Sequence, residues 1–200
     1  SCDLNGHMDP IELEKAIQVS IDEGKQPIFV GATAGTTVRG TFDPLSKIAD
    51  ICDKFNLWFH VDASWGGSVI ISSKHNHLLN GVDRSNSLTW CAHKMMGMPL
   101  MCTAALFKDS SILQKINSVH GTDYLFHDDI DNNINLGEHS LQCGRRTDAV
   151  KLWLSWKYLG DKGFEKNIDH IFDMAQYARN KIEASKLLKL ITPVESLNIC

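Results

Sequence analysis

An aspartate and a lysine each follow a short apolar run, and their residue types could do chemistry together. Asp62 directly follows the segment 57–61, whose Leu-Trp-Phe-His-Val sequence predicts a buried strand. A carboxylate beside such a run is costly unless a cation compensates it, and a protonated ring nitrogen would be such a cation. Lys94 comes just after the next predicted strand, 87–91. Its amine is a possible nucleophile towards a carbonyl carbon.

The pair matches what pyridoxal phosphate (PLP) chemistry needs from a protein. A lysine amine must form an imine with the cofactor aldehyde, and an anion must keep the pyridine nitrogen protonated so that the ring accepts electrons. His93 adjoins the lysine and could contact the phosphate or the ring. Taken singly, such an aspartate is more often a helix cap, and such a lysine a surface group. Many α/β proteins contain such a pair by chance, so spacing alone does not decide.

Alternating helix and strand signals surround this pair. Asp9-Pro10 predicts a helix start, with Asp9 as N-cap and Glu12 completing a capping box. Asp43-Pro44 predicts a second helix start of the same kind. Strands are predicted at residues 27–30, 57–61, 87–91 and 102–107. Strands that alternate with capped helices indicate a mostly parallel α/β sheet.

Three polar residues fall at or just past the ends of predicted strands: Thr33, Asp62 and Lys94. In parallel sheets, ligands bind outside the carboxyl ends of the strands. We therefore expect these side chains to meet at one edge of the sheet, although they are far apart in the sequence.

The second half of the chain is predicted to be mostly helical. Residues 148–159 predict a helix with Gly160 as its C-cap, and the apolar spacing over 164–182 predicts a long amphipathic helix. Strands of a second, small domain are expected at 187–191 and 196–200. The polar stretch 120–139 is expected to be an exposed loop.

Composition argues against several classes of partner. The net charge is −4, so no basic surplus predicts binding to nucleic acid. No apolar run approaches the ~18 residues that a membrane span needs. His75 and His77 lack a third ligand at a recognised spacing, so no metal site is predicted.

Cysteine usage predicts a reducing compartment. The six cysteines are widely spaced, and none forms a Cys-x-x-Cys pair. They are Cys2, Cys52, Cys91, Cys102, Cys143 and Cys200. Their mostly apolar neighbours favour buried, reduced thiols over disulfides, and hence a cytoplasmic location.

An ordered set of motifs carries a family resemblance. The segments are Ala32–Thr37, Phe42–Pro44, His60–Ala63, Trp65–Gly67, His93–Lys94 and Leu141–Arg146. Together they resemble the group II PLP decarboxylases, and among these the glutamate, cysteine-sulfinate and aspartate decarboxylases. The resemblance implies PLP fold type I (aspartate aminotransferase-like) and a homodimer with the active site at the subunit interface. It also implies an interior fragment, with residues 1–159 in the PLP-binding large domain and 160–200 beginning a small C-terminal α+β domain.

The resemblance assigns roles to individual residues. Lys94 would be the imine lysine and Asp62 the partner of the pyridinium. Thr33 would contact the cofactor near its ring hydroxyl, and His93 would lie on the phosphate side. Ser64 stands where the family usually has an alanine against the ring face.

Two departures from the family pattern affect the predicted site. Cys91 and Ala92 replace an asparagine and a proline, so Cys91 would be a weaker partner for the phosphate. The family's mobile loop usually carries a tyrosine that protonates the carbanion, and none stands in the corresponding stretch here. His127 is the predicted substitute acid, since the ordinary pKa of an imidazole lies near neutrality. A solvated loop without a catalytic role is the alternative.

The expected activity is the removal of the α-carboxylate of an acidic L-amino acid as CO2. Glutamate, aspartate and cysteine sulfinate are the expected small-molecule substrates, with PLP as cofactor. The alternatives are a PLP decarboxylase acting on an aromatic amino acid or diaminobutyrate, and a non-catalytic remnant that only dimerises.

Overall fold

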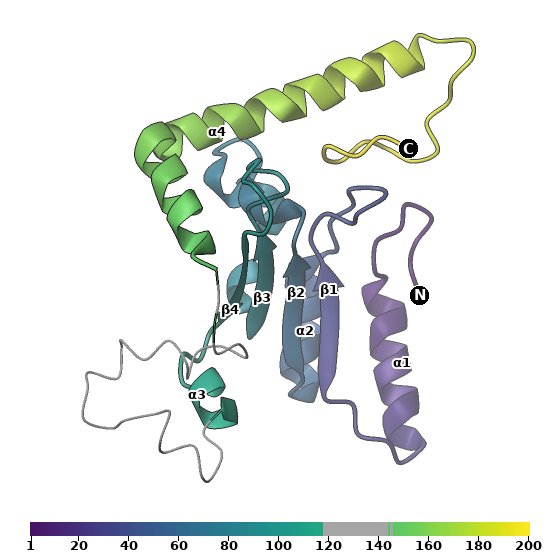
Figure 1. Cartoon of the computed structure of the whole chain (residues 1–200). Helices are drawn as coiled ribbons and strands as arrows, with labels where there is room; N and C mark the ends of the chain where they lie inside the picture. Colours follow the sequence, from purple (N-terminus) through teal and green to yellow (C-terminus); the bar gives the residue numbers. More distant parts are fainter. Residues whose placement is uncertain (118–143, 145) are drawn as a thin grey trace, which may run out of the picture.

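A four-stranded sheet organises the computed structural model, which describes residues 1–117, 144 and 146–200 (Figure 1). The strands are β1 (Phe29–Thr33), β2 (Trp58–Ala63), β3 (Ser87–Cys91) and β4 (Thr103–Phe107), in the spatial order β1-β2-β3-β4. The pairs β1–β2 and β2–β3 are parallel, and β3–β4 is antiparallel. The prediction of a mostly parallel sheet is confirmed. The first strand begins at Phe29 and not at Pro27.

β4 runs antiparallel because of its short connection to β3. A parallel connection needs a crossover of about a dozen residues or more, usually a helix. The segment 92–102 between the two strands contains no helix, so the chain turns back beside β3. The same turn carries Lys94.

The helices are α1 (Pro10–Asp22), α2 (Leu45–Phe55), α3 (Ile112–Asn117) and α4 (Asp148–Glu183), with short 3₁₀ turns η1 (Gly66–Ile71), η2 (Asn76–Leu79) and η3 (Val82–Arg84). Figure 1 shows α1 beside β1 and α2 behind the sheet. None of the described helices is long and apolar enough to cross a membrane.

The hydrophobic core lies between α2 and one face of the sheet. Leu45 and Ile48 of α2 are almost completely buried, as are Phe59 and Val61 of β2. Side chains alternate between the two faces of a strand, so the intervening residues of β1 and β2 lie on the opposite face. That face remains partly exposed: Phe29 is 55% exposed.

The start of α1 confirms half of the predicted capping box. The Asp9 carboxylate accepts hydrogen bonds from Ile11 N (2.9 Å) and Glu12 N (3.3 Å), as an N-cap does. Glu12 does not return the bond. Its carboxylate binds Lys15 Nζ (2.6 Å), and Asp9 N donates to Ser1 O (3.2 Å) instead.

The predicted cap at Asp43 is wrong. The N-cap of α2 is Pro44, and no side chain caps it. Asp43 is buried, and its carboxylate accepts hydrogen bonds from Met8 N (2.6 Å) and Thr33 N (2.7 Å). Asp43 N also donates to Thr33 O (2.9 Å). The residue therefore joins three chain segments, and we call this meeting point the Asp43 crossing.

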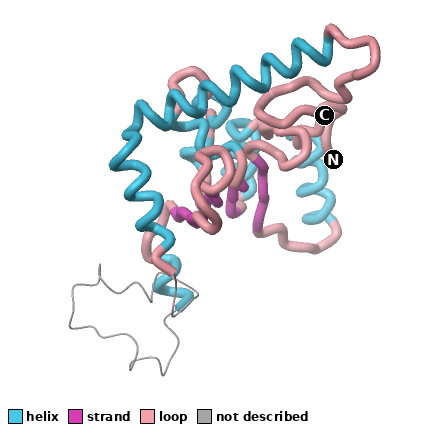
Figure 2. Tube along the Cα trace, turned by 45° about the horizontal axis from the view of Figure 1, so that its top comes forward, coloured by secondary structure: helices cyan, strands magenta, loops and turns pink. Residues whose placement is uncertain are grey.

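α4 consists of two arms that meet at Gly160, whose φ of 64° and ψ of 178° are not helical. Figure 2 shows the bend between the arms. The predicted helix end at Gly160 is confirmed. The second arm packs on the rest of the molecule through Phe164 and Ile168, which are fully buried.

The C-terminal segment contradicts one prediction. The expected strands at 187–191 and 196–200 are absent, although these residues are described. A single backbone bond, from Ile191 N to Cys200 O (2.8 Å), joins the two stretches. The division into domains at residue 160 stays a prediction.

Cysteines in the described part of the chain are unpaired. Cys52, Cys91 and Cys102 are buried, whereas Cys2 is exposed and Cys200 is partly exposed. Burial raises the pKa of the Cys52 thiol to about 11, so it stays protonated at neutral pH. The prediction of buried thiols holds for three of these five residues.

Candidate active site

Asp62 lies near the carboxyl end of β2, on the partly exposed face of the sheet. Its Cα is paired in register with Thr33 of β1 on one side and with Thr89 of β3 on the other. The alternation along β2 buries Val61 and Ala63 and leaves Asp62 exposed. The backbone register therefore brings Thr33 and Asp62 together, as the sequence predicted.

One oxygen of the Asp62 carboxylate is held by Ser64. Asp62 Oδ1 accepts hydrogen bonds from Ser64 N (3.0 Å) and from Ser64 Oγ (2.5 Å). The other oxygen, Oδ2, forms no hydrogen bond or ion pair with any described residue. An exposed carboxylate with one unfilled oxygen can accept a proton or a hydrogen bond from a ligand.

Lys94 lies in a tight turn just after β3. Lys94 N donates to Cys91 O (3.2 Å), and the following residues Met95 and Met96 are buried. Their apolar packing anchors the turn and thereby fixes where the half-buried Lys94 side chain begins.

Trp65 links the lysine to the segment that follows Asp62. Lys94 Nζ lies 5.3 Å from the centroid of the Trp65 ring, within the range of a cation–π contact. The next residue, Gly66, packs closely on Ala34: Gly66 N donates to Ala34 O (2.9 Å), and a Cβ at Gly66 would lie only 2.5 Å from that oxygen. With the described residues the Lys94 ammonium forms no ion pair or hydrogen bond.

His93 is fixed through one ring nitrogen. His93 Nδ1 lies 3.0 Å from both Cys102 N and Cys102 O, so either tautomer finds a partner there. Nε2 bonds to no described residue. It is the nitrogen that could contact a phosphate.

Cys91 is less well placed for the role that the sequence suggested. Its side chain is buried, and Sγ lies 3.3 Å from Thr103 Oγ1 on the neighbouring strand. This contact gives the thiol a structural role between β3 and β4. A phosphate contact by Cys91 stays a prediction.

Comparison with known proteins identifies the family. The model of the pyridoxal-dependent decarboxylase conserved domain matches residues 1–200. The chain belongs to this family. Mouse CSAD has a similar structure with 42% sequence identity and a TM-score of 0.93, and the match covers 100% of this chain and 42% of that one.

Two further solved structures that resemble this chain come from proteins with other names. Oryza sativa TDC, solved with PLP and tryptamine, is 27% identical with a TM-score of 0.90, covering 99% of this chain and 41% of that one. The third structure is the glutamate decarboxylase domain of diaminobutyrate-pyruvate transaminase and L-2,4-diaminobutyrate decarboxylase from Vibrio parahaemolyticus. It is 27% identical with a TM-score of 0.80, and the match covers 99% of this chain and 37% of that one. The chain thus spans about two fifths of these relatives. The α/β fold expected from the resemblance is confirmed.

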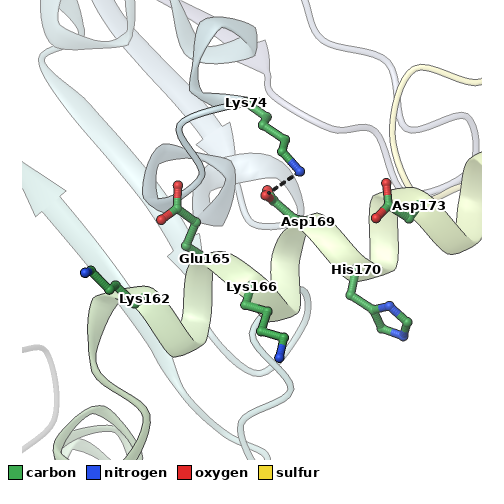
Figure 3. Close-up of a pocket in the computed structure, with 7 residues that line it drawn as sticks. All are labelled: Lys74, Lys162, Glu165, Lys166, Asp169, His170 and Asp173. Carbon is green, nitrogen blue, oxygen red and sulfur yellow. Dashed lines mark ion pairs between the residues drawn. The ribbon is translucent and has the colours of Figure 1, made fainter.

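Two hollows in the described surface lie away from this site. The larger, of about 440 Å³, is shown in Figure 3. It is lined by Lys74, Lys162, Glu165, Lys166, Asp169, His170 and Asp173. The smaller, of about 290 Å³, includes His75, Phe172 and Glu195. Neither contains Thr33, Asp62 or Lys94.

The larger hollow lies where α4 packs against the segment 72–74. Lys74 Nζ lies 3.0 Å from Asp169 Oδ2, as the dashed line in Figure 3 marks. Ser72 Oγ donates to Asp169 Oδ1 (2.5 Å). The Ser72 hydrogen bond and the Lys74 ion pair lower the pKa of the Asp169 carboxyl. These charges satisfy one another and hold the second arm of α4 against the turn at residue 72.

Two contributors to the site have no role in the sequence prediction. Trp65 was part of a motif, but its contact with Lys94 depends on the close approach of Gly66 to Ala34, which follows β1. Asp43 fixes Thr33 from ten positions away. His127, and most of the motif Leu141–Arg146, lie outside the described residues.

Proposed function

We propose that this chain is part of a PLP-dependent carboxy-lyase acting on an acidic L-amino acid. The observation that carries the proposal is the placement of an unfilled carboxylate oxygen on Asp62 and of Lys94 at the carboxyl ends of the neighbouring parallel strands β2 and β3. Neither charge forms an ion pair with a described residue, and opposite charges of this kind at one edge are typical of a site whose ligand supplies the partners.

The residues present fit PLP. When bound, the cofactor supplies a conjugated ring that takes up the electrons left by departing CO2. Asp62 Oδ2 would hold the proton on the ring nitrogen. Lys94 would bind the aldehyde covalently and exchange with the substrate amine. Trp65 would cover one side of the lysine amine and limit its access to water.

Thr33 and His93 would orient the cofactor from either side. Thr33 lies beside Asp62 in the sheet, which suits a contact near the ring hydroxyl. His93 Nε2 would meet the phosphate, because Nδ1 is occupied by the backbone of Cys102. The assignment of His127 as proton donor stays a prediction, as do the homodimer and the cytoplasmic location.

Preference for an acidic substrate rests on sequence similarity. The motifs resemble those of glutamate, cysteine-sulfinate and aspartate decarboxylases, and identity is 42% to mouse CSAD but 27% to Oryza sativa TDC. The relatives named for tryptamine and diaminobutyrate have the same fold. Decarboxylation of an aromatic amino acid or of diaminobutyrate is therefore the second candidate.

An amine-product screen tests the proposal. The intact protein, loaded with PLP, is incubated with glutamate, aspartate, cysteine sulfinate, diaminobutyrate and tryptophan, and the amines and CO2 are quantified. We expect the highest kcat/KM with one of the first three. Preference for an aromatic substrate or diaminobutyrate would overturn the acidic assignment. Cofactor binding without product from any substrate would favour the non-catalytic remnant.

A further inference from the structure

Asp62 and Ser64 form a pattern that recurs elsewhere in the chain. At Asp109, Oδ1 accepts hydrogen bonds from Ser111 N (2.9 Å) and Ser111 Oγ (2.6 Å). The same spacing and the same oxygen are used at Asp62. The pattern by itself is an ordinary local turn.

The two sites differ at the second carboxylate oxygen. Asp109 Oδ2 receives the Lys115 ammonium at 3.3 Å, so both oxygens of that carboxylate are used. Asp62 Oδ2 has no cationic partner among the described residues. The position that a lysine fills at Asp109 is open at Asp62, at the edge where the cofactor's ring nitrogen is expected.

Ser64 is the described residue that restrains the Asp62 carboxylate. The register partners Thr33 and Thr89 pair with Asp62 through the backbone, and neither side chain bonds to its carboxylate. A bond between a hydroxyl and a carboxylate is charge-assisted and stronger than a neutral one. Rotation of the carboxylate is therefore opposed mainly by the Ser64 hydroxyl and amide.

We propose that Ser64 is a positioning residue for the decarboxylase site. By holding Oδ1, it directs Oδ2 of Asp62 towards the protonated ring nitrogen of PLP. This inference rests on the proposed function and adds to the expectation that residue 64 merely lies against the ring face. Ser64→Ala keeps the backbone bond but loses the hydroxyl bond, so the carboxylate gains freedom to turn away.

The test compares Ser64→Ala with Ser64→Thr in the PLP-loaded protein. Thr retains a hydroxyl that can donate to Oδ1. We expect Ser64→Ala to lower kcat about tenfold, as a lost bond to a charged group does, with KM within about twofold because substrate contacts are unchanged. The pH midpoint of the bound cofactor's absorbance should shift in Ser64→Ala, and Ser64→Thr should restore both values.

Ser111→Ala is the matched control, because it removes the same bond at Asp109. It should leave kcat and the spectral midpoint unchanged. A double-mutant cycle on PLP affinity adds a second readout: Ser64→Ala should weaken binding in wild type but add no loss to Asp62→Ala. Ser64→Ala with unchanged kcat and spectral midpoint would overturn the positioning role, while Lys94-dependent decarboxylation of an acidic substrate would still support the proposed function. A wild-type protein that binds no PLP would overturn both.

Discussion

The Asp43 crossing and the edge at Asp62 use the same functional group in opposite ways. At the crossing, Asp43 is 8% exposed, and both its carboxylate oxygens accept backbone amides. At the edge, Asp62 is exposed and one oxygen has no partner among the described residues. A buried carboxylate must find its hydrogen-bond partners within the fold, whereas an exposed carboxylate can leave an oxygen available to a ligand.

The Asp43 crossing therefore serves the stability of the fold and the edge at Asp62 serves the chemistry, although the two regions are in contact. Asp43 holds the backbone of Thr33, and Thr33 is the register partner of Asp62. The crossing thus supports the strand end that presents the reactive edge. Changes at the edge should alter turnover and spare stability, whereas changes at the crossing should act mainly on stability.

The largest expected effect is at the edge, with Lys94→Ala. Turnover of the PLP-loaded protein should fall by about a thousandfold or more, because no other amine replaces the nucleophile. Lys94→Arg should not rescue it, since a guanidinium stays protonated. Steady-state amine production and the absorbance of the bound cofactor measure this. Turnover within tenfold of wild type would remove Lys94 from its assigned role.

Asp62→Asn tests the other half of the edge. The amide cannot stabilise a protonated pyridine as a carboxylate does, so kcat should fall about a hundredfold to a thousandfold. PLP occupancy should stay substantial, and the free energy of unfolding should change by less than about 0.5 kcal/mol, because the residue is exposed. Occupancy by absorbance, together with urea denaturation, separates the two effects. A normal rate with full occupancy would identify Asp62 as a purely structural residue.

The sequence predicted the edge better than the crossing for a physical reason. Asp62 and Lys94 follow strands whose apolar runs are visible locally, and the parallel register aligns their ends. Asp43 precedes Pro44, which is the local pattern of a helix cap. Its actual partners, Met8 N and Thr33 N, are brought to it only by the tertiary fold.

Other errors have the same origin. The contact between Trp65 and Lys94 depends on the close approach of Gly66 to Ala34, and no periodicity encodes that approach. At the C-terminus, the sequence predicts strands at 187–191 and 196–200, and the structure has none there. Instead, Asn198 Nδ2 donates to Thr37 O (2.6 Å), so a side chain and not a strand ladder ties this segment to the sheet domain.

A smaller effect, mainly on stability, is expected at the crossing from Asp43→Asn. The amide retains one acceptor oxygen, but its NH2 group would face the second backbone N–H and leave that donor unsatisfied. The free energy of unfolding should fall by about 1–3 kcal/mol, measured by urea denaturation. Asp109→Asn, at an exposed site, is the control and should cost less than about 0.5 kcal/mol. The comparison fails if Asp43→Asn is as stable as the control variant.

The smallest effect concerns His7, which adjoins Met8 at the crossing. His7 Nε2 lies 2.7 Å from Glu195 Oε1, and Nδ1 lies 3.0 Å from Asp3 Oδ2. Burial opposes protonation of the imidazole, but the hydrogen bonds to Glu195 and Asp3 outweigh it and raise the pKa of His7 above its ordinary value of 6.5. The charged imidazolium therefore ties the N-terminal segment to residue 195.

A raised folded-state pKa fixes the sign of the pH dependence. The His7 contribution is fully present below the unfolded pKa, as long as both carboxylates stay ionised, and it is lost as pH rises through the folded pKa. His7→Gln should therefore lower stability by at most about 1 kcal/mol near pH 5.5, as expected for a partly exposed ion pair, and by less near pH 9. Urea midpoints at the two pH values measure this. His77→Gln is the control, because the His77 imidazole contacts the backbone carbonyl of Lys74 and no carboxylate of a described residue. A His7→Gln deficit that grows with pH would show that the neutral imidazole, and not the ion pair, secures the segment beside the crossing.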